Sequence, residues 1–343
     1  MKSHNEPLVP GELTATLVET YSTLGDAFHG LRNIPLPSAA EVAMVIERLR
    51  EVLFPGIANG FRPAAADLRP FVEATLHEVA FSLRKQICLA QRYMHRHARP
   101  NAECVECDSC ADQVTRGFLA DLPAIRKALT LDAEAAMAGD PAARDLGEVI
   151  LSYPGHYAIT AQRIAHSLWV RGAPLVPRMI TEHAHHFTGI DIHPGATIGE
   201  RFFIDHGTGV VVGETTMIGN RVRLYQGVTL GALSLSSKKV KELRAGPKRH
   251  PTLEDDVIVY SGATILGGET VIGRGTIVGG NCWIVESVPP HSRVTVQVAS
   301  AVRQAGNVRS QPPTADSAET AAEPRNPPSL LSGSFPEALD WVI

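Results

Sequence analysis

Aliphatic residues return at every sixth position between residues 190 and 290. The members of this series are Ile192, Ile198, Ile204, Val212, Ile218, Leu224, Leu230, Leu266, Ile272, Val278 and Ile284. The series slips by two residues after Ile204 and is interrupted after Leu230. Glycine often follows the aliphatic residue, and a small or β-branched residue recurs four positions after it. A helix repeats its buried face about every 3.6 residues and a strand about every two, so neither accounts for this period.

A period of six is typical of a parallel β-helix, in which each short strand points one side chain inward before the chain turns a corner. Three hexads would form one triangular coil, and the inward aliphatic residues would stack into a column. About eleven hexads fit the segment, which predicts roughly four coils. A β-sandwich with glycine turns is the alternative, but it leaves the six-residue register unexplained.

Residues 36–188, before the repeat, show helical periodicity instead. The predicted helices span residues 38–54, 70–96, 110–119, 122–137, 153–169 and 174–187. Ser38, with Glu41 three residues later, favours a helix start, and Pro55 and Gly56 favour an end. The apolar residues at helical spacing in this first helix, which are predicted to form its buried stripe, are Val42, Val45, Ile46, Leu49 and Leu53. The predicted fold class is therefore α+β, with an α-helical domain at 36–188 followed by a β-helix domain at 189–304.

The two ends of the chain lack such patterns. Residues 1–35 are predicted to be flexible or loosely docked. Residues 305–343 are predicted to be a disordered tail, because residues 311–330 are rich in Pro, Ala, Ser and Glu and cannot bury a core. The last nine residues differ, since they contain Phe335, Trp341 and a terminal Ile343. They predict a short recognition segment on a flexible tether.

Composition narrows the class of protein. The chain has 343 residues, 44% of them hydrophobic, and a net charge of -4, enough for one large or two moderate cores. No apolar run approaches the roughly 20 residues of a membrane helix, and the N-terminus has no signal-peptide core. Five cysteines are few for a secreted disulfide framework. We therefore expect a soluble, cytoplasmic protein, and the mildly acidic balance gives no reason to expect nucleic acid or a membrane as partner.

Cys104, Cys107 and Cys110 form a C-x2-C-x2-C pattern, with His95 and His97 upstream. Thiolates at this spacing suit a metal site, because neighbouring sulfurs reach one ion. Cysteines at this spacing also line one face of a helix, and no second C-x2-C pair follows. Both interpretations stay open. Neither implies a catalytic role, because the cluster lies outside the repeat.

Polar residues that interrupt the repeat are the candidates for chemistry. Asp205 and His206 lie at the slip in register, and Asp191 and His193 lie one coil earlier. Asp191 and His206 are 15 residues apart, close to one turn of three hexads, which can bring a carboxylate beside an imidazole. Such a pair orients the ring and stabilises its cation, as a general base requires. The alternative is a structural pair that caps exposed strand edges.

A basic segment closes the long excursion from the repeat at residues 232–249. Its cations are Lys238, Lys239, Lys241, Arg244, Lys248 and Arg249. They predict attraction of a phosphate-bearing or carboxylate-bearing ligand, although most of the lysines also fit a solvated loop. No G-x-S-x-G motif occurs, and Cys282 falls on a packed small-residue position. A covalent acyl-enzyme is therefore not expected.

Several motifs occur in an ordered set: Gly189-Ile-Asp-Ile-His-Pro194, Ile204-Asp-His-Gly-Thr-Gly209, Val212-Gly-Glu-Thr215, Gln226-Gly-Val-Thr-Leu-Gly231 and Arg249-His-Pro251. Upstream, the set extends through Gly139-Asp-Pro-Ala142, Tyr153-Pro-Gly155 and the stretch from Tyr157 to His166. Together these motifs resemble the serine O-acetyltransferases of the hexapeptide acyltransferase superfamily, over about residues 129–290. The resemblance implies a left-handed parallel β-helix. It also implies transfer of acetyl from acetyl-CoA to the hydroxyl of L-serine, a step of cysteine biosynthesis.

The resemblance further implies a role for each matching residue. His206 matches the family's general base and Asp191 its partner. Carboxylates that hold the serine ammonium match Asp140 and Asp205, and groups that hold its carboxylate match Arg249 and His250. The co-substrate acetyl-CoA would lie in a groove between adjacent β-helices, beside Ala232, Ser261, Gly279 and Gly280. No metal is implied. The excursion before Arg249 is longer than in the best-known members, which leaves the CoA end of the site open.

Assembly and partners follow from the same resemblance. Members of the family form trimers through their β-helices, and some pair trimers through N-terminal helices, so a homotrimer or a dimer of trimers is expected. L-Cysteine is expected as a feedback inhibitor. In the family a C-terminal isoleucine enters the active site of cysteine synthase, and Ile343, with Trp341 and Asp340 before it, fits that segment.

Two other functions are compatible with the repeat. Left-handed β-helices also carry zinc carbonic anhydrases, for which the candidate ligands are His183, His185, His186, His193, His206 and His250. Against this, a dication would repel Arg249. The second alternative is a non-catalytic scaffold that binds a partner through its tail. Stoichiometric zinc that is lost together with activity on chelation would favour the anhydrase, and undetectable consumption of acetyl-CoA in the presence of serine would favour the scaffold.

Overall fold

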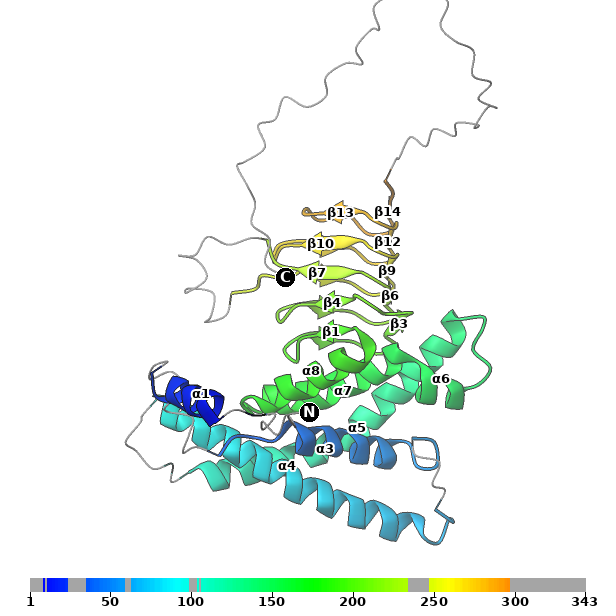
Figure 1. Cartoon of the computed structure of the whole chain (residues 1–343). Coiled ribbons are helices and arrows are strands. Elements are labelled where there is room, and N and C mark those ends of the chain that lie inside the picture. Colours follow the sequence, from blue (N-terminus) through cyan, green and yellow to red (C-terminus); the bar gives the residue numbers. More distant parts are fainter. Residues whose placement is uncertain are drawn as a thin grey trace, which may run out of the picture.

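The helices after the first one pack together and close one end of a β-helix (Figure 1). This computed structural model describes residues 9, 11–23, 35–58, 63–98, 104, 106–233 and 247–296. The helices are α1 (Gly11–Thr23), α3 (Ala39–Leu53), α4 (Leu68–Ala98), α5 (Cys107–Gly139), α6 (Leu146–Ser152), α7 (Pro154–Val170) and α8 (Val176–Thr188). Within the described ranges, no helix is both long enough and apolar enough to cross a membrane.

Helix α3 has the start and the buried stripe that the sequence predicted. Its N-cap Ser38 accepts a hydrogen bond from the backbone N–H of Glu41 at 3.3 Å. All five residues of the predicted stripe are buried, where α3 packs against α4 and α8. These predictions are confirmed because a cap and a helical period depend on residues close together in the chain.

Residues 107–139 form the single helix α5, where the sequence predicted two. Pro123 lies in its interior without ending it. Asp121 accepts hydrogen bonds from Ser167 Oγ at 2.7 Å and from Arg171 Nη2 at 2.8 Å. Side chains at the C-terminal end of α7 therefore bind the turn of α5 that precedes the proline. Tertiary packing therefore outweighs the local break, and the prediction of two helices was wrong.

The structure joins Cys104 and Cys107 in a disulfide and leaves Cys110 as a free, exposed thiol at the start of α5. Two of the three sulfurs considered as metal ligands are thus bonded to each other. Over the part of the chain that the structure describes, no three metal-ligating side chains lie together.

The N-terminal segment contains helix α1, although the sequence showed no sustained helical pattern there. Its side chains, where described, are almost all exposed. Residues 305–343, for which a disordered tail with a recognition segment was predicted, lie outside the described residues.

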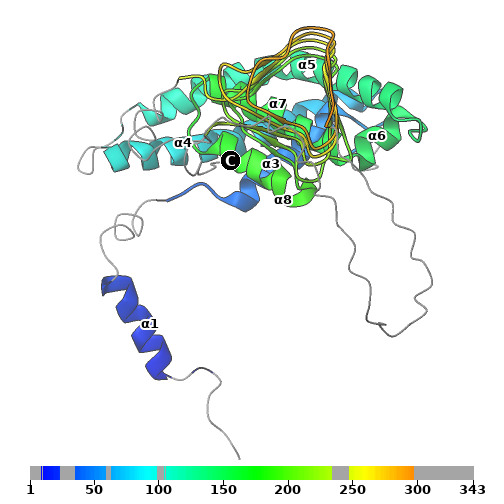
Figure 2. The same cartoon turned by 90° about the horizontal axis from the view of Figure 1, so that it is seen from above.

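Fourteen short strands in the described region stack into three parallel sheets, which form the faces of a triangular β-helix (Figure 2). Face A contains β1 (Asp191–Ile192), β4 (Val211–Val212), β7 (Thr229–Gly231), β10 (Thr264–Leu266) and β13 (Trp283–Ile284). Face B contains β2 (Thr197–Ile198), β5 (Met217–Ile218), β8 (Thr252–Leu253) and β11 (Val271–Ile272). Face C contains β3 (Phe203–Asp205), β6 (Arg223–Tyr225), β9 (Ile258–Val259), β12 (Ile277–Val278) and β14 (Arg293–Val294). The predicted parallel β-helix is confirmed.

The inward column agrees with the predicted series except around Leu266. On face A, Ile265 aligns with Leu230, while Leu266 pairs with Gly231. One extra residue therefore lies at this corner, where Gly267 adopts a φ of 104°. The column also contains the buried residues Leu253 and Val259, which the predicted series omitted. Strands stack five deep on two faces and four deep on the third, so the prediction of four coils was too low.

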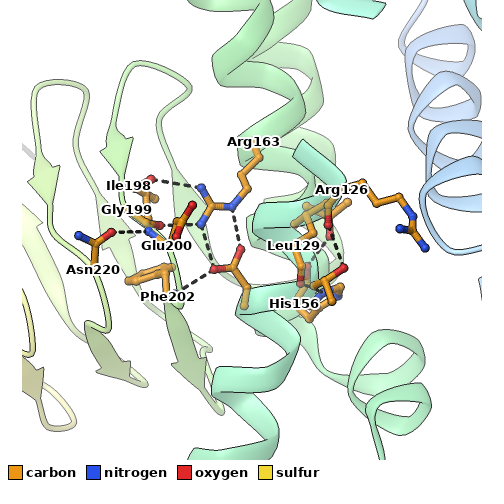
Figure 3. Close-up of polar contacts among 12 residues, drawn as sticks. Arg126, Leu129, His156, Arg163, Ile198, Gly199, Glu200, Phe202 and Asn220 are labelled. Atoms are coloured by element: carbon orange, nitrogen blue, oxygen red, sulfur yellow. Dashed lines mark hydrogen bonds and ion pairs between the residues drawn. The ribbon is translucent and has the colours of Figure 1, made fainter. Parts of the chain in front are cut away.

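A buried ion pair joins the helical layer to the first coil (Figure 3). Arg163 of α7 donates from Nε to Asp132 Oδ2 of α5 at 2.7 Å and from Nη2 to Oδ1 at 2.9 Å. The same guanidinium donates to the carbonyls of Ile198 and Gly199, and Asp132 Oδ1 accepts from the Phe202 N–H at 2.9 Å. Burial raises the pKa of Asp132, and these donors oppose that rise. Because α5 and β3 both carry candidate site residues, the pair fixes their relative position.

Candidate functional site

Two groups of polar residues lie at two different corners of the β-helix. The C–A corner is the edge where the chain passes from face C to face A, as it does between β3 and β4. The residues gathered there are Asp140, Tyr153, Asp205, His206 and Arg223. The A–B corner is the edge where the chain passes from face A to face B, as it does between β4 and β5. The residues gathered there are Glu214, Thr215, Arg249 and His250. The structure therefore divides the predicted substrate-binding residues between two edges of face A.

The C–A corner of the first coil is wider than a regular hexad corner. Asp191 pairs with Val211, 20 residues further on, which is two more than three hexads. The chain turns here with positive φ at His206 (61°) and Gly207 (91°). A Cβ on Gly207 would collide with Ile190, so glycine permits the tight turn. As a result, the His206 side chain projects outward and is 69% exposed.

Asp140 caps the C-terminus of α5 and is held by two neutral donors. The Tyr153 hydroxyl donates to its Oδ2 at 2.6 Å, and the Ala142 N–H donates to its Oδ1 at 2.8 Å. These bonds, Tyr153 first, lower the pKa of Asp140, and electrostatic interactions with the His206 and Arg223 side chains add to the effect. The same bond raises the pKa of Tyr153 to about 12. The carboxylate is thus stabilised in its ionised form without being neutralised by a direct ion pair.

Asp205, at the end of β3, lies between a cation and the imidazole. Arg223 Nη2 donates to its Oδ2 at 2.6 Å. Its Oδ1 lies 3.8 Å from His206 Nε2, which is an electrostatic contact and not a hydrogen bond. The predicted residues Asp140, Asp205 and His206 are therefore brought together at one corner.

At the A–B corner, His250 is held in one tautomer. Its Nδ1 accepts from the Thr215 N–H at 3.1 Å and lies 2.9 Å from Thr215 Oγ1. Burial, followed by the charge of Arg249, lowers the pKa of His250 to about 4. The ring is therefore neutral near pH 7, with its proton on Nε2. Gly213 is required beside it, because a Cβ there would collide with the ring.

Thr215 organises the two residues predicted to hold the substrate carboxylate. Its Oγ1 accepts from the backbone N–H of Arg249 at 2.9 Å and of His250 at 3.0 Å. The Arg249 guanidinium forms an ion pair with Glu214. Arg249 and His250 are thus brought together, but at the opposite edge of face A from Asp140.

Asp191 and His193 lie on and just beyond β1, between the two corners. Asp191 forms its ion pair with Arg178, at 3.8 Å. His193 packs edge-on against Trp169, with ring centroids 5.0 Å apart, and burial lowers its pKa. Within the described residues, no hydrogen bond or ion pair joins Asp191 to His206. The partnership of these two residues therefore stays a prediction.

The predicted CoA-binding residues lie on upper coils of both corners. Ser261 and Gly280 stack at the C–A corner, where the Asn281 N–H donates to the Ser261 carbonyl at 2.9 Å. Gly279 follows β12 at the same corner, whereas Ala232 follows β7 at the A–B corner and is buried. The basic side chains Lys238, Lys239, Lys241 and Arg244 lie outside the described residues.

Four residues make direct contacts at these corners although no role was predicted for them: Tyr153, Glu214, Thr215 and Arg223. Tyr153, Glu214 and Thr215 fall inside the motifs of the resemblance, so that signal could have identified them. Arg223 occupies an outward position on β6, where an arginine is ordinary, and only the folded structure brings it to Asp205.

Comparison with known sequences places the chain in a family, although no family model matches it. The "Serine acetyltransferase, plasmid" of Synechococcus elongatus is 44% identical over 273 residues, which cover 79% of this chain and 84% of the relative. A serine acetyltransferase of Bacillus licheniformis is 46% identical over 199 residues, or 55% of this chain and 87% of the relative. The chain belongs to the serine acetyltransferase family. It is therefore an acyltransferase, as the resemblance implied.

Solved structures agree with this assignment. Serine acetyltransferase isoform 3 from Entamoeba histolytica, in complex with cysteine, has a TM-score of 0.64 and 33% identity, covering 86% of this chain and 94% of that chain. Serine acetyltransferase 1 from the same organism, in complex with L-cysteine, has a TM-score of 0.63 and 34% identity, covering 83% of this chain and 97% of that chain. The predicted order of a helical domain and a β-helix is confirmed.

Proposed function

We propose that this protein transfers acetyl from acetyl-CoA to the hydroxyl of L-serine, giving O-acetyl-L-serine and CoA. The observation that carries this proposal is the C–A corner, where the exposed imidazole of His206 lies beside Asp140 and Asp205. Two carboxyl groups suit an ammonium group, and an imidazole suits removal of a hydroxyl proton. The family to which the chain belongs supports the same chemistry.

His206 acts as the general base in this mechanism. It takes the serine hydroxyl proton while the hydroxyl oxygen attacks the thioester carbonyl carbon. The carbon–sulfur bond then breaks, and the proton passes to the CoA sulfur. Asp191 orients the imidazole, as the resemblance implies. Cys282 is buried, with its Sγ 3.8 Å from the Val294 carbonyl, which supports direct transfer without an acyl-enzyme.

Serine is held at its two charged ends. Asp140 and Asp205 take the ammonium, and Arg249 and His250 take the carboxylate. Because Nδ1 of His250 accepts from Thr215, the ring offers Nε2–H as a neutral donor. Arg249 supplies the positive charge, and its ion pair with Glu214 sets the direction of the guanidinium.

In this proposal a single copy of the chain does not surround one serine with both groups, since they lie at opposite edges of face A. We therefore include a homotrimer in the proposal, in which the C–A corner of one copy meets the A–B corner of the next. The division of the site residues between two corners supports this arrangement, either alone or within a dimer of trimers.

Acetyl-CoA occupies the groove between adjacent copies. Its pantetheine arm runs up the C–A corner from His206 past Ser261, Gly279 and Gly280, with Ala232 of the neighbouring copy on the other side. Small residues at these positions support close approach of a thin chain. The basic segment before Arg249 is suited to the CoA phosphates.

L-Cysteine is proposed as an inhibitor of the same site. It carries the ammonium and carboxylate of serine and replaces the hydroxyl by a thiol, so the same charged groups would hold it. The two Entamoeba histolytica structures contain bound cysteine, which supports this proposal. The relatives favour acetyl transfer over both the carbonic anhydrase and the scaffold alternatives.

An assay of the purified full chain with acetyl-CoA and L-serine tests the proposed function. Release of CoA, followed with a thiol reagent, should require serine and should slow when L-cysteine is added at constant serine. Mass spectrometry should identify O-acetylserine as the product. Serine-independent thioester loss, or no CoA release, would contradict the proposal.

A further inference from the structure

Arg223 lies at the C–A corner but has no part in the mechanism above. Its guanidinium contacts two rings, with Cζ 4.8 Å from the centroid of Phe203 and 4.7 Å from that of Tyr225. Tyr225 in turn stacks on Tyr260, with ring centroids 5.0 Å apart. Contacts with two rings restrict the orientation of this guanidinium.

The charge is aimed at one oxygen of Asp205. Arg223 Nη2 binds Oδ2 at 2.6 Å, and the Arg223 side chain is only 22% exposed. The other oxygen, Oδ1, faces His206 Nε2 at 3.8 Å, just beyond hydrogen-bond distance. A carboxylate that closed on this nitrogen would stabilise the imidazolium, and an imidazolium cannot accept a proton. Arg223 competes with His206 for this carboxylate.

Arg223 also sets the charge that the corner presents to a substrate. Asp140 receives only neutral direct donors, from Tyr153 and the Ala142 backbone, so its negative charge remains. The charge of Asp205 is balanced by Arg223. The negative charge of Asp140 therefore faces the substrate ammonium, while Asp205 Oδ1 stays outside hydrogen-bond distance of His206 Nε2.

We infer that Arg223 is a positioning residue for the reaction, which holds the Asp205 carboxylate away from His206 Nε2 and so keeps the imidazole available as a base. The inference rests on the proposed acetyl transfer to serine. It adds a residue to which neither the motifs nor the resemblance gave a role.

Kinetics of Arg223→Gln provide the first test, because glutamine removes the charge and keeps much of the side chain. We expect kcat to fall on the order of 10–100-fold, while the acetyl-CoA KM stays within about twofold. The deficit should shrink between about pH 7 and about pH 9, since the freed Asp205 favours a protonated ring that higher pH deprotonates. Arg223→Lys should restore part of the rate. The matched control is Arg221→Gln on the same coil, where an exposed arginine pairs with Asp256, and it should behave as wild type.

A second measurement does not depend on serine acetylation. Diethylpyrocarbonate modifies neutral imidazole, so mass spectrometry of the His206 peptide across pH reports the protonation of this ring directly. In Arg223→Gln the midpoint of modification should move to higher pH than in wild type. Equal midpoints, or a kcat deficit that is the same at both pH values, would overturn the inference. A wild-type protein that does not acetylate serine would contradict the proposed function instead, while the modification midpoint would still decide the role of Arg223.

Discussion

The Tyr153 hydroxyl donates to Asp140 Oδ2 at 2.6 Å and thereby ties the start of α7 to the end of α5. This bond is the first cause of the lowered pKa of Asp140. A neutral donor keeps the carboxylate ionised without competing charge, so the full negative charge remains for a substrate ammonium.

Tyr153→Phe should raise the serine KM by about tenfold at neutral pH, because one donor to Asp140 is lost. The effect should grow as the solution is acidified. Loss of the bond moves the pKa of Asp140 back up towards its ordinary value of 3.8, so the carboxylate protonates earlier on the way down. Initial rates at several serine concentrations and pH values test this. Tyr157→Phe is the matched control, since it removes a tyrosine–carboxylate bond (2.8 Å to Glu47) away from both corners, and a similar loss there would count against a local effect.

His206→Ala should fold and assemble normally but lose about 10²–10⁴ in kcat, the range that general-base assistance typically supplies. Asp191→Asn should lose less, because it acts through His206. Turnover and size-exclusion chromatography check both variants, with the exposed His291→Ala as control. A His206→Ala protein with more than half of wild-type turnover would remove this residue from the mechanism.

Gly213→Ala should weaken serine binding although it adds only a methyl group. The new Cβ would collide with the His250 ring, which must then leave its hydrogen bond with Thr215. We expect the serine KM to rise several-fold, by roughly 1 kcal/mol of lost binding, with little change in the acetyl-CoA KM. Gly11→Ala, where nothing lies within 4 Å, is the control. Equal weakening of both substrates would indicate that the A–B corner holds CoA instead.

Arg163→Met should lower the free energy of unfolding by about 3–5 kcal/mol, because it leaves the buried Asp132 carboxylate without its cation. Arg221→Met removes an exposed pair and should cost about 0–1 kcal/mol. Urea unfolding at constant protein concentration compares them. Removing both charges, in Arg163→Met with Asp132→Leu, should destabilise less than Arg163→Met alone. A larger loss in the double variant would contradict the buried-charge explanation.

Deletion of Ile343 should abolish binding to cysteine synthase and leave acetyl transfer intact. The resemblance implies that the terminal carboxylate occupies the amino-acid site of the partner, so amidation of a ten-residue tail peptide should have the same effect. Calorimetry with the synthase and both peptides measures this. The control is Asp340→Asn, which alters the tail but keeps its free carboxylate, and unchanged affinity after loss of Ile343 would refute the hypothesis.

Short-range patterns in the sequence determined the elements of this fold and one part of the site. The six-residue period predicts the β-helix because each inward aliphatic residue repeats the same local geometry. The cap at Ser38 predicts the start of α3 for a similar reason. Even the two-residue slip after Ile204 marks the turn that projects His206, because extra residues must leave the regular coil.

Only the tertiary structure decided what depends on contacts between distant residues. Packing against α7 keeps α5 a single helix although Pro123 lies in its interior. An extra residue at one corner of the β-helix places Ile265, not Leu266, in the inward column. Tyr153 and Arg223 become site residues because folding brings a helix cap and an outward strand position to Asp140 and Asp205. A periodic pattern specifies which way a side chain points along its own strand or helix, but which partner it meets depends on the arrangement of the whole chain.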